Sequence, residues 1–415
     1  MLLISELYWN NESDQTLKIP AVTEINSMYK GKTVLSQMQS IIFGYDFRKT
    51  VNEYNGDKGI RSLTTANLMS IMLYVHMARK QSLRDIVDSL MSKRNLWYHL
   101  GLTSISRNNL SYALQNRSSE IFEKTFYMLL GKLQKERGTA TDKRFKFKMP
   151  VKSIDSTTIS LCLSLFDWAK FRITKGGIKL HVVYDNKEQL PEFINISAAG
   201  SHDITKAKTF PIKAESIYAM DKGYICFKFF QKVAQNKAFF VTRTKSNTRY
   251  RILKRNTQKQ KNIKADWTVK LTGVKADEYS GNLRVVKYKD LETGKTYEFL
   301  TNNFRLSAQS IADVYKARWD IELFFKWIKQ NLKIKTFIGT SENAVRIQIW
   351  TALIACLLTE YLRFKVRSSY TLLKTFRLMC ENLLFSIDIH ELLNDSPPKI
   401  KNIFETQEYQ LTIWA

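Results

Sequence analysis

Apolar and polar positions alternate with the period of a helix over residues 307–335. The apolar positions of this stretch are Ile311, Val314, Ile321, Phe325, Ile328 and Leu332. Ser307 is a preferred N-cap residue, and neither Gly nor Pro interrupts the run. We therefore expect a single helix over residues 307–335, with one apolar face against the core.

Four polar side chains lie beside this apolar stripe, namely Tyr315, Arg318, Glu322 and Lys329. At about 100° per residue, their spacing places all four within an arc of roughly 60° at the edge of the buried face. A solvated face with one i,i+4 Arg–Glu pair, worth a few tenths of a kcal/mol, would explain any single residue. The set as a whole favours a functional surface, because a solvated face has no reason to border the core so closely or to carry a tyrosine.

Strand-like patterns precede this helix. β-branched and aromatic residues predict strands at residues 151–159, 179–184, 191–196, 216–221 and 238–243, with a turn at the Lys175-Gly-Gly sequence. Three early strands, a β-α-β passage and then a helix follow the order of an RNase H-like α/β layer. Further strands at 267–271, 283–288 and 297–301 predict a β-rich insertion before the helix.

The pattern divides the chain into six parts. Residues 1–30 are a weakly patterned extension, 31–135 an all-helical N-terminal domain, and 150–245 the first part of the RNase H-like core. Residues 246–304 are the β-rich insertion, 305–340 the second part of the core, and 341–415 a C-terminal helical region. We therefore expect an α/β core that an insertion interrupts, with helices before and after it.

The N-terminal helices resemble a helix-turn-helix. Short helices are expected after Ser62 and Ser82, and a third begins at Ser106. The third carries the polar residues Arg107, Asn108, Asn109 and Arg117. One interpretation is a DNA-binding domain that contacts DNA through Arg107. A plain helical bundle is the other, and the pattern leaves both open.

The charge balance points to a polyanionic partner. Lys and Arg number 65 against 38 Asp and Glu, which gives a formal net charge of +27. A content of 44% hydrophobic and 12% aromatic residues is that of a folded chain, so the charge does not come from a disordered tail. Nucleic acid ranks first as the partner, before an anionic membrane. Residues 237–265 hold ten Lys and Arg, including Arg243 and Lys245, and no Asp or Glu, which makes this run a candidate DNA contact.

Cysteine usage and hydropathy argue against two other classes of protein. The four cysteines lie far apart without the spacing of zinc ligands, which disfavours structural zinc and disulfides and fits the reduced cytoplasm. The most apolar window, residues 347–362, is short and contains polar side chains. We expect a buried helix there, no membrane partner, and a cytoplasmic, DNA-associated protein.

Three carboxylates are the strongest candidates for chemistry: Asp155, Asp221 and Glu322. Asp155 lies within one predicted strand and Asp221 ends another, where an unpaired buried charge costs several kcal/mol. Two divalent ions would offset this cost, because Mg²⁺ prefers carboxylate oxygens and Mn²⁺ can substitute for it. Two such ions can clamp the attacking and leaving oxygens of a phosphoryl transfer.

Cationic and hydrogen-bonding side chains complete this candidate site. Arg318 and Lys329, with Tyr315, would hold the DNA backbone near the scissile phosphate, since Arg matches phosphate bidentately and Lys acts as a point charge. His181 and His202 lie near the same layer, where we expect hydrogen-bonding residues before metal ligands. Neither a GxSxG nor a GxxxxGK[ST] motif occurs, which disfavours serine hydrolases and phosphate-loop nucleotide binding.

The spacing Tyr315-x2-Arg318-x3-Glu322-x6-Lys329 matches the Tyr-Arg-Glu-Lys signature of the IS-four family of insertion-sequence transposases. Asp155 in SIDSTTI and Asp221 in MDKGY resemble that family's first and second catalytic aspartates, with Glu322 as the third. The resemblance runs from about residue 29 to residue 393. It implies an RNase H fold, Mg²⁺-dependent cleavage of transposon-end DNA, strand transfer to target DNA, and a homodimer in a synaptic complex.

One position departs from the family pattern. Members that form DNA hairpins carry a Trp in the insertion where this chain has Tyr297, four residues before Thr301. A tyrosine can still stack on a flipped base, so the hairpin route stays open. Two alternatives to a transposase also stay open: an RNase H-like nuclease without strand transfer, and an inactive DNA-binding regulator.

Overall fold

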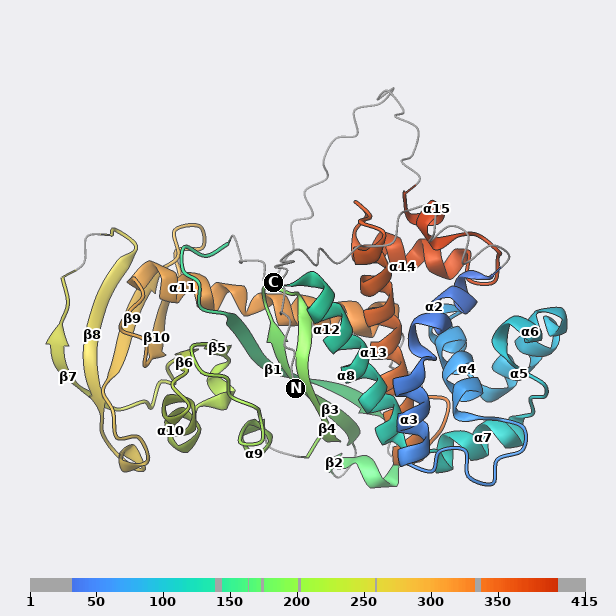
Figure 1. Cartoon of the computed structure of the whole chain (residues 1–415). Coiled ribbons are helices and arrows are strands. Elements are labelled where there is room, and N and C mark those ends of the chain that lie inside the picture. Colours follow the sequence, from blue (N-terminus) through green and yellow to red (C-terminus); the bar gives the residue numbers. More distant parts are fainter. Residues whose placement is uncertain are drawn as a thin grey trace, which may run out of the picture.

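A computed structural model describes residues 32–138, 144–162, 164–172, 175–200, 203–257, 260–332 and 337–394 of the chain. The predicted extension over residues 1–30, the candidate hydrogen-bonding residue His202 and the last part of the C-terminal region lie outside these ranges. A mixed sheet forms one half of the molecule, and helices from both ends of the chain pack together as the other half (Figure 1).

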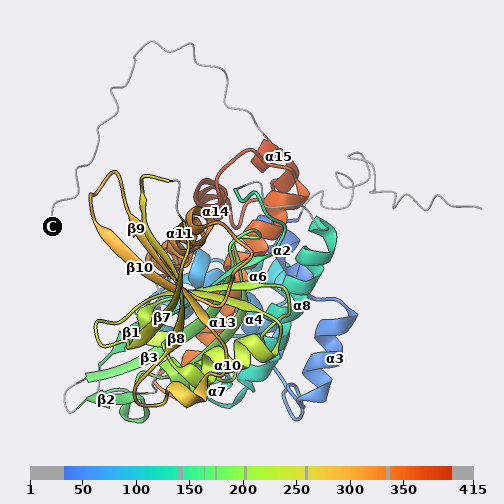
Figure 2. The same ribbon diagram turned by 90° about the vertical axis from the view of Figure 1, so that its left-hand side faces the viewer.

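Ten strands of the described residues form one sheet. The strands are β1 (Val151–Leu161), β2 (Lys170–Arg172), β3 (Lys175–Asp185), β4 (Leu190–Ala198), β5 (Ile217–Met220), β6 (Phe239–Arg243), β7 (Tyr250–Arg255), β8 (Ile263–Leu271), β9 (Leu283–Lys289) and β10 (Thr296–Thr301). Their order is β2-β3-β1-β5-β6-β10-β9-β8-β7, with β4 paired to β3 off this path. Seen from the end that carries β7 to β10, the strands fan out as in a twisted sheet (Figure 2).

Parallel and antiparallel pairs meet at β1. This strand runs antiparallel to β3 and parallel to β5, and β5 runs parallel to β6. Between β5 and β6 the chain crosses over through a short 3₁₀ turn (Lys222–Tyr224) and the helix α10 (Phe227–Gln235). The predicted β-α-β passage is therefore present, and it places the ends of β1 and β5 next to each other.

Helices cover both faces of the sheet, as alternation along β5 shows. Ile217 and Ala219 pack with α11 (Ala308–Ala317), while Tyr218 and Met220 pack with α10 on the opposite face. Successive side chains of a strand point to opposite faces, so a strand that is buried on both sides lacks polar positions. This accounts for the four consecutive buried residues of β5.

The predicted insertion continues the same sheet. β10 pairs antiparallel with β6, and β9, β8 and β7 follow outward. The strands at 267–271, 283–288 and 297–301 are found within β8, β9 and β10, whereas β2 and β7 were not predicted. The domain boundaries drawn from the sequence stay predictions.

The predicted turn at Lys175-Gly-Gly is wrong, because these residues open strand β3. A Cβ atom at Gly177 would lie 3.2 Å from the Cβ of Ala199 and 3.2 Å from the carbonyl oxygen of Ile159. Glycine thus permits a close approach of neighbouring strands at this position and does not mark a turn.

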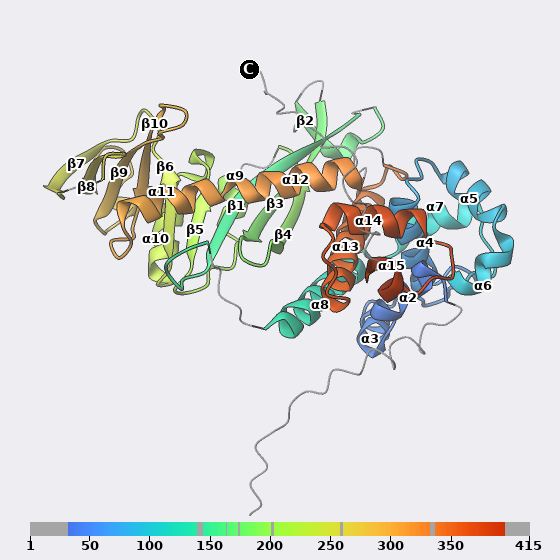
Figure 3. The same ribbon diagram turned by 90° about the horizontal axis from the view of Figure 1, so that it is seen from above.

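The single helix predicted over residues 307–335 is also corrected. The structure has two helices nearly in line, α11 and α12 (Trp319–Asn331), divided at Arg318 (Figure 3). Ser307 is the N-cap, as predicted, and its side chain accepts from the Ser310 N–H. At the division the Ile321 N–H donates to the carbonyl of Arg318, only three residues back. This tighter turn separates the two helices.

The remaining helices are α2 (Val34–Ile42), α3 (Tyr45–Glu53), α4 (Thr65–Met77), α5 (Leu83–Met91), α6 (Trp97–Leu100), α7 (Arg107–Asn116), α8 (Ser119–Arg137), α9 (Asp203–Ala207), α13 (Glu342–Lys365), α14 (Leu372–Glu381) and α15 (Ile389–Asn394). Among the described helices, α13 alone has the length and apolar composition to cross a membrane, and 94% of its apolar window is buried inside the protein. It packs against α4, α7, α8 and α14, which confirms the predicted buried helix.

Arg117 has a structural role and is not the DNA contact that the helix-turn-helix interpretation allowed. Its guanidinium is buried and donates to the carbonyl oxygens of Gly56 and Leu63. Arg107, by contrast, is exposed in the first turn of α7. Only Arg107 of these two therefore stays a candidate DNA contact.

Candidate active site

Strand register places two of the predicted carboxylates side by side. Ile154 of β1 pairs with Met220 of β5, and Asp155 and Asp221 are the next residues on the two parallel strands. Neighbouring strands lie roughly 4.8 Å apart, so the two aspartates leave adjacent points of the sheet. Asp221 also caps the following 3₁₀ turn, where its carboxylate accepts from the Gly223 N–H at 3.1 Å.

Arg318 joins the first and third predicted carboxylates. Its Nη1 donates to Asp155 Oδ2 at 2.8 Å, and its Nη2 donates to Glu322 Oε1 at 2.6 Å. The Arg318 side chain is 11% exposed, against 19% for Asp155 and 32% for Glu322. The i,i+4 pair thus belongs to a partly buried three-residue cluster and not to a solvated face.

Asn186 holds the division between α11 and α12 against the sheet. The Asn186 side chain is fully buried, and its Nδ2 donates to the carbonyl oxygen of Ala317 at 2.6 Å. Its Oδ1 accepts from the hydroxyl of Ser153 on β1 at 2.8 Å. Asn186 therefore satisfies a carbonyl at the division between α11 and α12 and ties that division to the strand that carries Asp155.

The environment shifts the pKa of Asp155. Burial raises the pKa of Asp155 to about 6, and the negative charges of Asp221 and Glu322 add to the rise. The Ser156 N–H, which donates to Asp155 Oδ1 at 2.8 Å, and the Arg318 charge oppose it. The three carboxylates thus share one electrostatic neighbourhood in which a cation would favour the ionised form.

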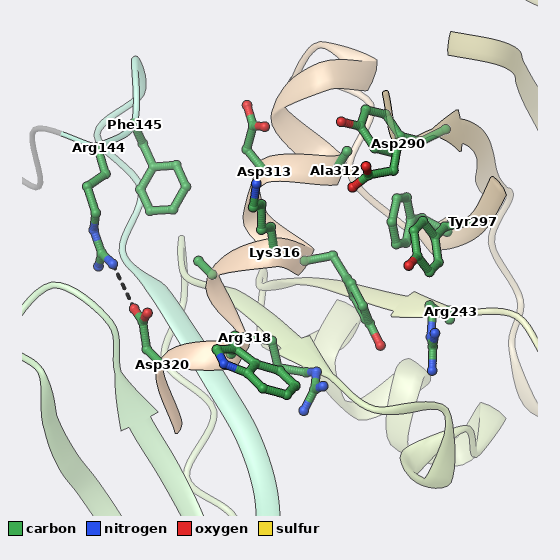
Figure 4. A pocket seen from close by; sticks show the side chains of 15 residues that line it. Arg144, Phe145, Arg243, Asp290, Tyr297, Ala312, Asp313, Lys316, Arg318 and Asp320 are labelled. Carbon is green, nitrogen blue, oxygen red and sulfur yellow. Dashed lines mark hydrogen bonds and ion pairs between the residues drawn. The ribbon is translucent and has the colours of Figure 1, made fainter. Parts of the chain in front are cut away.

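A cleft of about 740 Å³ opens beside these residues (Figure 4). Arg243 and Tyr297 lie on one side of it, while Arg144 and Phe145 lie on the other, where Arg144 donates to Asp320 at 2.7 Å. The lining residues are Arg144, Phe145, Arg243, Tyr288, Asp290, Tyr297, Phe299, Ala312, Asp313, Tyr315, Lys316, Ala317, Arg318, Trp319 and Asp320. Six aromatic side chains and four cations line this cleft together with the carboxylates Asp290, Asp313 and Asp320, and the rings and cations suit a strand of nucleic acid.

Tyr315 and Arg243 connect the cleft to the carboxylates. The Tyr315 ring lies 5.6 Å from the guanidinium carbon of Arg318 and 5.7 Å from that of Arg243. Arg243 reaches toward Asp221, with Nη2 at 4.0 Å from Oδ1, and also lies 5.8 Å from the Tyr297 ring. Burial raises the pKa of Tyr315, so its phenol stays protonated at neutral pH.

The other predicted site residues lie outside this cluster. Lys329 is half-buried on α12, about two turns beyond Glu322, and is not part of the cleft lining. Lys245 follows β6, where its backbone N–H donates to Thr248. Arg107 lies among the N-terminal helices, at the other end of the molecule from β7 (Figure 1).

Sequence reasoning missed several polar partners of the site. Asn186, Ser156, Asp203 and the pairing of Arg144 with Asp320 were not singled out. Each acts through a contact between distant parts of the chain, such as the 131 residues that separate Asn186 from Ala317. No local spacing in the sequence predicts such a contact.

Among the described residues, no group of three or more His, Cys, Asp or Glu side chains lies close enough to hold a metal ion. Arg318 bridges Asp155 and Glu322 in this arrangement. The donor set is otherwise made of carboxylate oxygens alone, which are the ligands of hard cations such as Mg²⁺. A metal could therefore share these oxygens only after the guanidinium moves.

Comparison with known proteins gives one consistent result. The family described as Transposase DDE domain matches residues 146–358, about half of the chain, and a domain of unknown function matches residues 30–103. A protein of Sinorhizobium fredii (strain NBRC 101917 / NGR234) named as transposase y4zB is 37% identical over 59% of this chain and 68% of its own length. A Geobacillus stearothermophilus protein named for the transposase of insertion sequence element IS5377 is 26% identical over 81% of this chain and 86% of its own length. A Synechocystis sp. (strain ATCC 27184 / PCC 6803 / Kazusa) protein named for the transposase of insertion sequence element IS4SA is 25% identical over 74% of this chain and 88% of its own length.

Proposed function

The chain belongs to the transposase DDE domain family, and we propose that this DNA transposase cuts the ends of its insertion sequence and joins them to target DNA by metal-dependent phosphoryl transfer. The predicted resemblance to insertion-sequence transposases is confirmed by the relatives named for insertion sequence elements. One observation carries the proposed reaction. Asp155 and Asp221 lie in adjacent register, and Arg318, which is 163 residues from Asp155 in sequence, links Asp155 to Glu322.

We propose that the core is RNase H-like. The order β4-β3-β1-β5-β6 supports this, because an antiparallel three-stranded part is followed by two parallel strands. The position of the carboxylates agrees with it, since open α/β sheets place their sites at the ends of parallel strands near a switch in strand order. In this core the strands β7 to β10 would widen the surface available to DNA.

Asp155, Asp221 and Glu322 would hold two Mg²⁺ or Mn²⁺ ions. Their carboxylate oxygens fit such ions, and the raised pKa of Asp155 indicates a place where a cation is stabilising. Bound there, the ions would activate the attacking oxygen and stabilise the leaving oxygen of an in-line displacement.

The cationic and aromatic residues would position the DNA. Arg318 has two donors on one planar group, so a phosphate can take the place of its present carboxylate partners. Arg243 and Tyr315 line the same cleft, and Tyr297 adds a ring on which a base can stack. Lys329, Lys245 and Arg107 would contact the backbone further from the scissile bond. A homodimer that pairs two element ends follows from the family resemblance, and sedimentation with end DNA tests it.

Removal of each carboxylate tests the proposal. Asp155→Ala, Asp221→Ala and Glu322→Ala should each abolish nicking of end-labelled element DNA in Mg²⁺, while binding of the same DNA in Ca²⁺ stays near the wild-type level. The reason is that each variant loses a metal ligand but keeps the cationic surface. Asp277→Ala is the matched control, because Asp277 is an exposed acid in a short turn away from the cleft.

Product analysis separates the transposase from the nuclease alternative. Wild-type protein should yield both cut ends and strand-transfer product when target DNA is added. Cut ends without joined product would favour a nuclease, and a wild-type protein that binds DNA without cutting it would favour a regulator. A carboxylate variant that nicks at the wild-type rate would remove that residue from the site.

A further inference from the structure

A second polar cluster lies behind Asp155, on the other face of β1. Ser156 follows Asp155, and successive side chains of a strand point to opposite faces. The hydroxyl of Ser156 donates to Asp203 Oδ1 at 2.7 Å, from the opposite side of the sheet to Arg318. Asp203 is the first residue of the short helix α9, which packs against β3 and the 3₁₀ turn after Asp221.

Ser156 connects this cluster to the carboxylate of Asp155 through a single residue. Its backbone N–H donates to Asp155 Oδ1 at 2.8 Å, while its side chain is held by Asp203. The peptide group between positions 155 and 156 is therefore fixed from both faces. A change in the Ser156 side-chain contact would move the amide that orients the Asp155 carboxylate.

The surroundings hold Asp203 in place. Lys179 Nζ lies 3.2 Å from Asp203 Oδ1 and supplies an opposite charge. His181, which is opposite Ser156 in the antiparallel register, has no exposed side-chain surface, and its Nδ1 lies 3.4 Å from the same oxygen. The Nε2 of His181 bonds with the Ser197 hydroxyl at 3.0 Å. Burial lowers the pKa of His181 to about 4, so the ring is neutral at pH 7 and Lys179 is the adjacent cation.

Tyr224 links the same cluster to the second aspartate. Its backbone N–H donates to the carbonyl oxygen of Asp221 at 2.9 Å, and its ring is 2% exposed. The Tyr224 hydroxyl is buried, and the neighbouring Ser156 side chain opposes the rise in the pKa of this phenol. Burial is the main cause of the raised pKa of this phenol. The negative charge of Asp203 raises it further, and the charges of Asp155 and Asp221 add to the rise. The phenol therefore shares the electrostatic surroundings of Asp203, Asp155 and Asp221.

We propose that Asp203 is a positioning residue of the active site, which acts through the Ser156 hydroxyl to hold the Asp155 carboxylate in the orientation that binds a metal. The inference rests on the proposed function. Asp203 itself binds no metal and touches no DNA in this proposal. Asp203 fixes the geometry of the Asp155 carboxylate. Loss of Asp203 should therefore lower the affinity for metal and change the nicking rate at saturating metal much less.

Metal binding by the complex of full-length protein and element-end DNA tests the proposal. Bound Mn²⁺ is measured from the loss of the electron paramagnetic resonance signal of the free ion. Asp203→Ala should raise the half-saturating Mn²⁺ concentration about tenfold, as expected for one lost hydrogen bond to a charged group. Asp203→Asn keeps an oxygen that can accept from Ser156 and should stay within about threefold of wild type. The nicking rate at saturating metal should change less than the affinity does.

A double-mutant cycle checks that the effect passes through Ser156. Ser156→Ala should match Asp203→Ala, and the double variant should be no weaker than either single variant, because all three lose the same bond. Ser156→Ala also tests the contact from the strand side if Asp203→Ala does not fold. Asp85→Asn is the control, since Asp85 likewise pairs with a lysine, at 3.0 Å, near the start of a short helix.

The possible results distinguish the two proposals. Wild-type affinity in both Asp203→Ala and Ser156→Ala, or additive losses in the double variant, would overturn the positioning role alone. Mn²⁺ binding that does not change in Asp155→Ala would overturn the proposed metal site, and the positioning role with it. A lower melting temperature and a lower saturated rate at unchanged affinity would make Asp203 a residue of general stability, which also overturns the inference.

Discussion

At the scale of single residues, Arg318 competes with any cation that Asp155 and Glu322 could bind. Its two hydrogen bonds, at 2.8 and 2.6 Å, neutralise these carboxylates in the absence of DNA. A DNA phosphate offers the guanidinium an alternative bidentate partner. DNA binding should therefore raise the affinity for metal, and by linkage metal should raise the affinity for DNA.

Replacing Arg318 tests this competition. Arg318→Gln should strengthen Mn²⁺ binding of the DNA-free protein about tenfold, because a charge-assisted contact with the ligands is lost, and it should weaken DNA binding. Titration calorimetry with and without DNA measures both effects. Arg346→Gln is the control, since Arg346 forms a comparable i,i+4 pair with Glu342, at 2.7 Å, on α13. Equal Mn²⁺ affinity in wild type and Arg318→Gln would contradict the competition.

Tyr297 is the second prediction at this scale. Its ring lines the cleft, stacks on Phe299 with centroids 6.2 Å apart, and lies 5.8 Å from the Arg243 guanidinium. Stacking on a base is worth about 1–3 kcal/mol, so Tyr297→Ala should slow the step that needs a flipped base roughly ten- to a hundredfold. In the proposed reaction, cleavage of the second strand is the step that needs a flipped base, and the first nick needs no distortion.

A time course on end-labelled duplex resolves nicked from double-cut product. Tyr297→Trp should retain both steps, because indole also stacks. Phe299 already packs against both Tyr297 and Tyr315, so Tyr297 has a structural explanation as well. Equal slowing of both cuts in Tyr297→Ala, or no slowing of either, would show that packing is its only role.

At the scale of elements, the sequence predicted most strands and helices but not the features that depend on distant contacts. The N-caps at Ser82, Ser106 and Ser307 were correct, because a cap is a local signal. The division of α11 from α12 was missed, since Asn186, which satisfies the Ala317 carbonyl, comes from another element. Strand β7 was missed because its exposed, basic residues lack the alternation that marks a half-buried strand.

Part of the candidate site could be predicted because its signals are local in the sequence. A strand-borne carboxylate and a helical spacing are visible in sequence, and these features pointed to Asp155, Asp221, Glu322 and Arg318. Asp203 was not visible, because its signals are contacts with distant residues, namely Ser156, 47 residues away, and Lys179 and His181 of β3. Arg117 shows the opposite kind of error. The sequence placed it among the polar residues of a possible DNA-contacting helix, but its side chain is buried.

His76 joins three elements and predicts a pH effect on stability. It lies on α4, its Nε2 bonds with the Thr351 hydroxyl of α13 at 2.9 Å, and backbone groups of Leu332 and Gln348 also contact it. Burial lowers the pKa of His76 to about 4, from 6.5. The unfolded chain therefore takes up a proton between these pH values and the folded chain does not. Proton uptake by the unfolded chain lowers the free energy of unfolding. Above pH 6.5 His76 causes no such loss, and as the pH falls toward 4 the loss grows to about 3 kcal/mol.

Urea unfolding measured between about pH 7.5 and about pH 4.5 checks this effect. His76→Gln should flatten the fall in midpoint below pH 6.5, because glutamine does not titrate there. Thr351→Val is the matched control: it removes the partner of His76 but keeps the imidazole buried. This variant should be less stable at every pH and should keep the slope. A fall that persists unchanged in His76→Gln would assign the acid sensitivity to other groups.

At the scale of the whole molecule, the edge of the sheet at β7 is basic and lies far from the C-terminal helices. In the described sheet the strand order ends at β7, and Arg251 and Lys254 of that strand are exposed, as is Arg249 just before it. Figure 1 shows β7 at one end of the molecule and α14 in its helical half. An edge strand with a row of cations resists pairing with other sheets and offers a surface to DNA.

The salt dependence of DNA binding tests whether this edge contacts phosphate. For duplex DNA, log K falls with log salt by about 0.9 for each phosphate neutralised. Arg249→Ala, Arg251→Ala and Lys254→Ala, combined in one variant, should reduce this slope by about 0.9 for each side chain that makes a contact. Fluorescence anisotropy of labelled element-end DNA over a salt series gives the slope directly.

A variant that removes the same number of positive charges from the helical half of the molecule separates the effect of phosphate contact from that of net charge. Arg367, Lys374 and Arg377 are exposed on or near α14, and their replacement by alanine removes three positive charges as well. Exposed charges are screened beyond roughly 8–10 Å at physiological salt, so the slope should respond only to cations that touch phosphate. The α14 variant should therefore keep the wild-type slope while the β7 variant loses part of it. Equal slopes in the two variants would mean that the β7 cations form a solvated edge and that DNA lies elsewhere on the protein.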